Sequence, residues 1–149
     1  MTGRQRLRRL VNWLNLTTLT GFVVAWLGGS RPRRPRGALY VAPGYRARFP
    51  VVGAFTVGHV VSTPHAVHHV LDDAALLRHE SRHVTQYAWL GPLFWPAYGL
   101  AAAFSRVVSG HPASHNPFET GAGLADGGYT RRPLRGWLRW SAQRTDAPP

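Results

Sequence analysis

The feature that most constrains this chain is a His-Glu-x-x-His motif formed by His79, Glu80 and His83. On a helix, residues four apart lie one turn above each other on the same face, so both imidazoles could ligate one zinc ion. Glu80 could then act as general base on a metal-bound water. The alternative is a chance match on a surface helix, because eight of the 149 residues are histidine.

The sequence around the motif predicts a helix. Asp72 and Asp73 supply an N-cap and negative charge for its first turn. Residues 74–89 contain neither Gly nor Pro, and a Gly-Pro pair at 91–92 then ends the helix. We expect its apolar residues to pack inward around the two histidines; these are Leu76, Leu77, Val84, Tyr87 and Ala88.

A catalytic zinc site needs a third protein ligand and one open position. The chain has no cysteine, so this ligand must be His, Asp or Glu. Glu119 is the best candidate, because Asn116 predicts an N-cap, with the following proline as first helical residue and Glu119 in the first turn. Glu119 could instead fold back onto the Asn116 amide in a capping box. His111 and His115 are the competing third ligands.

These residues resemble the gluzincin class of zinc metallopeptidases in a very small version. With Gln86 the motif becomes His-Glu-x-x-His-x-x-Gln, which is similar to compact peptidase domains of bacterial toxins and of uncharacterised bacterial proteins. The later Asn-Pro-Phe-Glu and the segment 123–129 also resemble that group, and the resemblance covers residues 38–129. It implies that His79, His83 and Glu119 are zinc ligands and that Glu80 is the base.

The chain departs from the gluzincin pattern at one position. Gluzincins often place an acidic residue four positions after the ligand glutamate, where it orients a ligand histidine. Here that position is Gly123, and Asp126 is the nearest acid. This departure concerns the orientation of a ligand and leaves the three predicted zinc ligands in place.

The net charge of +12 favours an anionic partner. Arginines beside apolar and Trp-rich stretches favour an anionic membrane surface over nucleic acid, for which no binding motif is present. A plainly solvated basic surface is the third interpretation. The arginines concerned are Arg4, Arg6, Arg8, Arg9, Arg31, Arg33, Arg34, Arg36, Arg131, Arg132, Arg135 and Arg139.

Residues 10–29 are apolar and long enough to span a bilayer, but Asn12, Asn15 and three threonines make them a poor span. No cleavage site of a signal peptide follows them. We expect an interfacial amphipathic helix, or a helix packed on the domain. The predicted location is membrane-associated or cytoplasmic.

Three segments predict strands: 38–42, 45–49 and 54–62. We expect them to form a small, mostly antiparallel sheet in an α+β, zincin-like fold with three to four helices and an N-terminal apolar helix. The strand at 54–62 could pair with extended substrate beside the motif helix, or could be an ordinary sheet strand. The predicted domains are an N-terminal helix and linker (1–36), the zincin-like domain (37–130) and a basic tail (131–149).

Further along the chain, residues 93–104 are almost entirely apolar and predict a buried central helix kinked at Pro96, or one that dips into a membrane interface. Tyr129 is a candidate donor to a tetrahedral oxyanion. The histidines before the motif helix suggest a second metal site or, more simply, a solvated loop; they are His59, His65, His68 and His69.

The sequence therefore predicts a zinc-dependent metallopeptidase acting on a peptide or protein substrate. An esterase or amidase with the same zinc chemistry fits the sequence equally well. The first rival is a non-catalytic, membrane-surface-associated protein with a structural or vestigial metal site. The second is a nucleic-acid-binding protein that uses the arginine clusters.

Overall fold

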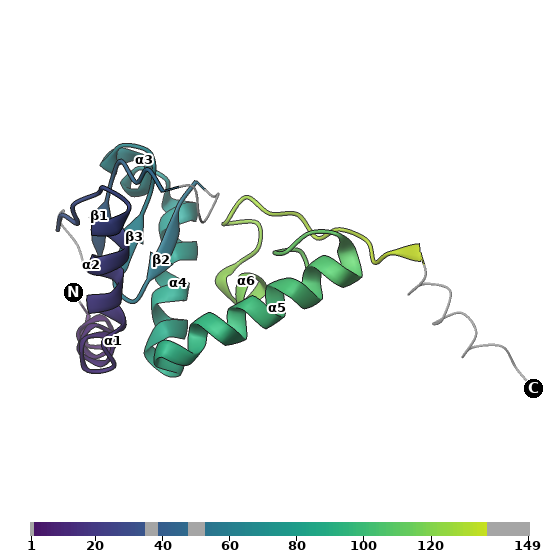
Figure 1. Ribbon diagram of the computed structural model, residues 1–149, viewed down its shortest axis with the longest axis horizontal. Coiled ribbons are helices and arrows are strands. Elements are labelled where there is room, and N and C mark those ends of the chain that lie inside the picture. Colours follow the sequence, from purple (N-terminus) through teal and green to yellow (C-terminus); the bar gives the residue numbers. More distant parts are fainter. Residues whose placement is uncertain (1, 35–38, 48–52, 137–149) are drawn as a thin grey trace, which may run out of the picture. The chain divides into compact units, whose positions relative to one another are not determined.

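A computed structural model of the chain describes residues 2–34, 39–47 and 53–136 (Figure 1). The chain divides into two compact units, Met1–Phe94 and Trp95–Pro149. The first contains a three-stranded sheet and the helix that carries the His-Glu-x-x-His motif. The α+β class predicted from the sequence is confirmed. The domain boundaries predicted from composition stay a prediction.

The sheet of the first unit consists of β1 (Tyr40–Ala42), β2 (Phe55–Val57) and β3 (Val60–Ser62) in the order β1-β3-β2. β1 pairs with β3 in parallel, and β2 pairs with β3 antiparallel, so the sheet is mixed rather than mostly antiparallel. β2 and β3 form a tight hairpin. Its turn contains Gly58 with φ +58°, a conformation that L side chains rarely adopt.

Two strand predictions are corrected by this arrangement. The single strand expected over 54–62 is the β2–β3 hairpin, because Gly58 reverses the chain in its middle. In the strand expected over 45–49, residues 45–47 are irregular and 48–49 lie outside the described residues. Tyr45 donates its N–H to the Thr63 carbonyl and packs its ring edge-on against Phe55, with ring centroids 4.9 Å apart.

Helices cover both faces of the sheet, as the alternation of side chains along a strand requires (Figure 1). Val41 and Val61 pack with Val84 and with Val70 of α3 (Val67–Leu71). Their strand neighbours Ala42 and Val60 pack on the opposite face, against Ala25 of α2 (Thr17–Leu27). The core therefore lies in two thin layers, one on each side of the sheet.

The segment predicted as one apolar helix over 10–29 is two helices, α1 (Gly3–Leu14) and α2. Leu16 between them has φ +64°, and the Asn15 side chain accepts hydrogen bonds from the Thr17 N–H and hydroxyl. These local bonds replace the helical ones and end α1. Among the described helices none is by itself long and apolar enough to cross a bilayer. α1 and α2 pass that test of length and composition together, but they are bent by 73° at the break.

Polar side chains attach α1 to α4 (Ala74–Leu90), the motif helix. Arg8 donates to the Ser81 carbonyl at 2.8 Å and to the Thr85 hydroxyl at 3.0 Å. Asn12 and Asn15 donate to the carbonyls of Val84 and Tyr87 at 3.0 and 3.1 Å. Burial lowers the pKa of Arg8. The asparagines that made this segment a poor membrane span thus hold α1 on α4.

The second unit contains most of α5 (Phe94–Ser109) and all of α6 (Pro117–Ala122). The prediction that the helix over 93–104 is buried is wrong. Leu100 and Phe104 are 74% and 59% exposed. Pro96 lies in the first turn of α5, where backbone N–H groups have no intrahelical partner, so the helix continues through it.

A close approach of α2 to the sheet at Gly21 gives a test of the fold. A Cβ at Gly21 would lie 2.4 Å from the Val57 carbonyl oxygen, which is backbone and cannot easily move. We expect Gly21→Ala to lower the free energy of unfolding by about 1–3 kcal/mol, measured by chemical denaturation. Gly3→Ala is the matched control, because nothing lies within 4 Å of a Cβ there. Equal stability of the two variants would contradict this packing.

Candidate metal centre

The motif helix α4 begins and ends as its sequence predicts. The Asp73 side chain accepts hydrogen bonds from the N–H groups of Ala75 and Leu76, both at 2.9 Å. At the other end Gly91 caps the helix with φ +57°. His79, Glu80 and His83 are 3%, 2% and 7% exposed, so the motif is buried rather than a chance match on a surface helix.

The two motif histidines face each other through their Nε2 atoms, which are 3.1 Å apart. Two imidazoles bound to one tetrahedral zinc ion would have these atoms about 3.3 Å apart. On the far side of the ring, His83 Nδ1 lies 2.8 Å from Gln86 Oε1. Because an amide oxygen only accepts, Nδ1 carries the proton and Nε2 keeps its lone pair for a metal.

Glu80 is held against strand β2. Its Oε2 accepts a hydrogen bond of 2.6 Å from the Thr56 hydroxyl, and both residues are buried. On α4, Tyr87 lies one turn after His83 and two turns after Glu80. Its pKa is raised, mainly by burial and secondly by the negative charge of Glu80. Tyr87 therefore stays a neutral phenol at ordinary pH.

Glu119 lies in the first turn of α6, as predicted. The Asn116 side chain caps this helix by accepting from the Phe118 N–H at 2.9 Å. The Asn116 N–H itself donates to the Ala113 carbonyl, and Glu119 Oε1 accepts from the Tyr98 hydroxyl at 2.5 Å. These bonds favour the ligand interpretation of Glu119 over the capping box. Glu119 is 3% exposed.

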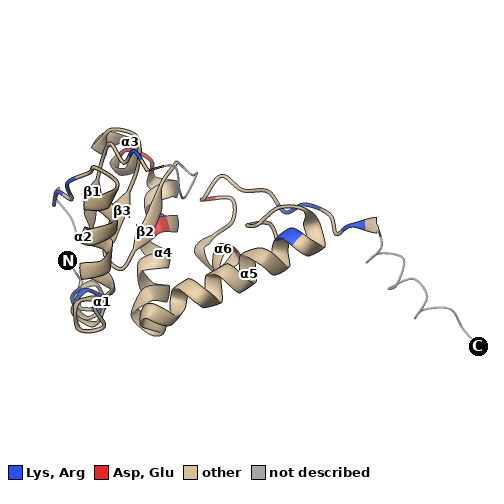
Figure 2. Cartoon of the chain, viewed as in Figure 1, with Lys and Arg blue, Asp and Glu red and all other residues tan. Residues whose placement is uncertain are grey.

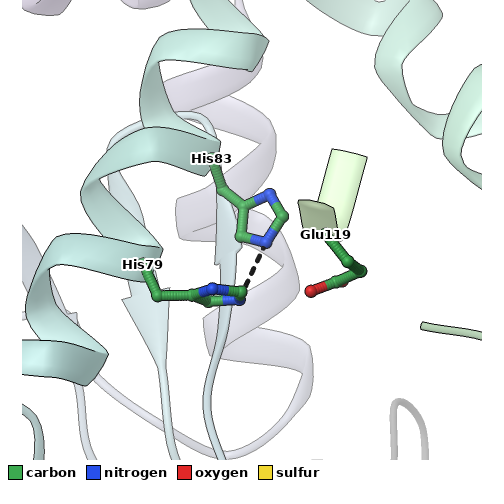
Figure 3. Close-up of side chains that lie close together, drawn as sticks. All are labelled: His79, His83 and Glu119. Carbon is green, nitrogen blue, oxygen red and sulfur yellow. Dashed lines mark hydrogen bonds between the residues drawn. The ribbon is translucent and has the colours of Figure 1, made fainter. Parts of the chain in front are cut away.

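His79, His83 and Glu119 form a buried group that could hold a metal ion (Figure 3). One ligand atom from each residue lies within 4.8 Å of the others. Two imidazole nitrogens and one carboxylate oxygen suit zinc, and they also suit other divalent first-row metals. Within residues 2–34, 39–47 and 53–136, this is the one such group of three or more His, Asp or Glu side chains.

The other candidate residues lie in different settings. His115 Nε2 bonds to the Arg132 carbonyl at 2.8 Å, and His111 Nδ1 lies 3.3 Å from the Ala113 amide nitrogen, so both rings have local roles. The Tyr129 ring packs on His111, with centroids 5.9 Å apart, and its role as an oxyanion donor stays a prediction.

The histidines that precede α4 differ in their burial. His59 is fully buried in the β2–β3 turn. His65, His68 and His69 are all solvent-exposed, but only His65 lies in a loop, because His68 and His69 are on α3. Among the described residues they belong to no group of three or more potential metal ligands.

Sequence reasoning missed three contributions to the site. Gln86 was noted as part of the motif but not as a partner of His83, although residues three apart on a helix can reach each other. Thr56 and Tyr98 were not predicted. Each is more than twenty residues from its carboxylate, and no local pattern marks such a pairing.

No protein-family model, curated protein or solved structure matches this chain significantly. The functional argument therefore rests on the residues and their geometry.

The first prediction for the site concerns metal content. We expect purified protein to carry about one divalent metal ion per chain by elemental analysis, and His79→Ala to carry less than about a tenth of that, because one ligand of three is lost. His68→Ala is the control, because His68 is exposed on α3 and outside the group. Equal metal content in both variants would contradict the assignment.

The second prediction concerns Gln86. Removing the acceptor for His83 Nδ1 in Gln86→Ala should weaken metal affinity about 10- to 100-fold, measured by competition with a chelating dye. Gln86→Glu keeps an acceptor at this position and should retain affinity within a few-fold of wild type. If the two variants bind metal alike, Gln86 does not orient His83.

Proposed function

We propose that this protein is a zinc-dependent metallopeptidase, with His79, His83 and Glu119 as zinc ligands and Glu80 as general base. The observation that carries the proposal is the buried His79–His83–Glu119 group, with the buried carboxylate of Glu80 next to His79 in the chain. The resemblance of the motif to gluzincins supports the same assignment.

The ligand set is compatible with a catalytic zinc ion. Catalytic zinc sites commonly use three protein ligands drawn from imidazole and carboxylate groups and keep one position open. A zinc ion bound here would polarise a substrate carbonyl and make a coordinated water more acidic. Tyr98 and Gln86 hold one ligand each, Glu119 and His83 respectively, through hydrogen bonds that fix the orientation of the ligating group.

Glu80 carries the proton transfers. Its carboxylate accepts a proton from the attacking water as the oxygen adds to the peptide carbonyl carbon. It then gives that proton to the leaving amine nitrogen as the C–N bond breaks, so that no net proton remains on the enzyme. The Thr56 hydroxyl donates to Glu80 Oε2 at 2.6 Å and thereby orients the carboxylate.

The position of β2 supports a peptide substrate. β2 is an edge strand of the sheet, and its Thr56 contacts Glu80 directly. An extended peptide that paired with this edge would run beside the general base, with main-chain hydrogen bonds supplying affinity independent of side-chain sequence. This is the role that the sequence suggested for residues 54–62, now narrowed to Phe55–Val57.

Glu80→Gln separates catalysis from metal binding. We expect this variant to bind zinc as tightly as wild type and to cleave peptides about 10²–10⁴-fold more slowly, because the amide cannot accept the proton. The assay is cleavage of a quenched-fluorescent peptide library by zinc-loaded protein, with and without chelator. His68→Ala should cleave at the wild-type rate.

Two outcomes would reject the proposal. The first is wild-type cleavage by Glu80→Gln. The second is a zinc-loaded wild type that cleaves no peptide, which would favour a structural metal site instead.

A further inference from the structure

The helices α1 and α2, together with Leu16 between them, present eight large exposed apolar side chains. In α1 the exposed apolar residues follow one another at intervals of three and four residues. In α2 the intervals are four, three and one residues. With this spacing, each set lies along one face of its helix. Their exposed fractions lie between 47% and 72%. The residues are Leu7, Leu10, Leu14, Leu16, Leu19, Val23, Trp26 and Leu27.

The opposite faces of both helices are packed, so this exposure follows from the fold of the first unit. α1 turns the buried Asn12 towards α4. α2 turns Thr18, Gly21 and Ala25 inward, and Gly21 lies against β2 and β3. The apolar stripes therefore face away from the unit's own core. Isolated exposed leucines are ordinary on a protein surface, but eight large apolar side chains exposed within 21 residues of chain point to an interaction surface.

The same segment is strongly basic. Arg4 and Arg6 are exposed on α1, and Arg31, Arg33 and Arg34 are exposed after α2. Figure 2 draws Lys and Arg in blue and shows blue segments on α1 and in the chain beside β1. The first acidic residue of the whole chain is Asp72, so nothing in residues 2–34 offsets this charge. Exposed leucine and tryptophan beside arginine match the boundary between the acyl chains and headgroups of an anionic bilayer.

We propose that α1 and α2 form a docking surface for an anionic lipid bilayer, on which the protein lies without crossing. Charge complementarity favours lipid headgroups as the occupant, and the 73° bend between the helices suits a pair lying along the interface. Trp26, 70% exposed, anchors the surface at headgroup level.

Docking would bring the motif helix to the bilayer. Arg8, Asn12 and Asn15 bond α1 to α4 directly, so α4 moves with α1 as one packed pair. The inference does not depend on the proposed peptidase activity, because it uses no residue of the metal group. A protein that binds vesicles but cleaves nothing would leave it intact.

The test is flotation of the full-length protein with vesicles. We expect binding to vesicles of about 30% phosphatidylglycerol in phosphatidylcholine, at least tenfold weaker binding to pure phosphatidylcholine, and release as salt rises from low to high concentration. Leu19→Ser combined with Trp26→Ser should weaken binding at least tenfold. Both side chains are exposed, so the fold should persist, and circular dichroism checks this.

Matched controls separate this surface from other apolar and basic residues. Leu100→Ser with Phe104→Ser removes two side chains of similar exposure from α5 and should leave binding unchanged. Arg4→Gln with Arg6→Gln should weaken binding about 20- to 30-fold. Arg106→Gln with Arg131→Gln removes the same charge from exposed positions outside α1 and α2 and should weaken it by much less.

Four results would overturn the proposal. The first two are that folded wild-type protein binds no vesicles, or that it binds neutral and anionic vesicles equally. The third is that Leu100→Ser with Phe104→Ser weakens vesicle binding as much as Leu19→Ser with Trp26→Ser. The fourth is that neither salt nor alkaline carbonate releases the bound protein, which would indicate insertion into the bilayer. If the wild-type protein binds no vesicles but self-associates, and Leu19→Ser with Trp26→Ser abolishes the self-association, the surface binds a second copy of the chain.

Discussion

Burying a carboxylate costs several kcal/mol unless hydrogen bonds or a cation offset the loss of water, and the rest of this structure depends on how that cost is met. Glu80 and Glu119 are both almost fully buried. Among their contacts, Glu80 accepts a hydrogen bond from the Thr56 hydroxyl and Glu119 accepts one from the Tyr98 hydroxyl. A divalent cation between Glu119 and the two imidazoles would add the attraction of opposite charges to these hydrogen bonds. The expectation of metal binding rests on the three buried ligand atoms that lie within 4.8 Å of one another.

The motif helix is held from two sides by polar bonds within the first unit. Arg8 and Asn12 bond to one side of α4, and Thr56 of β2 bonds to Glu80 on another. Val84 on the same helix lies in the apolar core with the sheet. Polar anchoring fixes the rotation of α4 more narrowly than apolar packing alone, because each hydrogen bond has a preferred direction. The Nε2 atoms of His79 and His83 are thereby held close to each other.

The features predicted best from the sequence are the ends of helices, because residues close in the chain determine them. Asp73 and Gly91 bound the motif helix, and Asn116 starts the short helix of Glu119, because each cap acts on backbone groups within four residues. The α1–α2 break and the β2–β3 hairpin were missed although their signals are also local. Asn15 and Gly58 stand inside apolar runs whose composition suggested one continuous element. The partners of Glu80 and Glu119 are distant in the chain and were beyond local patterns.

The most direct test of the metal centre is X-ray absorption spectroscopy of the zinc-loaded protein in solution. The account predicts two imidazole nitrogens at about 2.0–2.1 Å and light oxygen donors at about 2.0–2.2 Å, and almost no bound zinc in His83→Ala. Three or more imidazoles around zinc would contradict it, because the third would have to come from a histidine outside the His79–His83–Glu119 group. That result would reassign the site to the exposed histidines or to the His111–His115 loop.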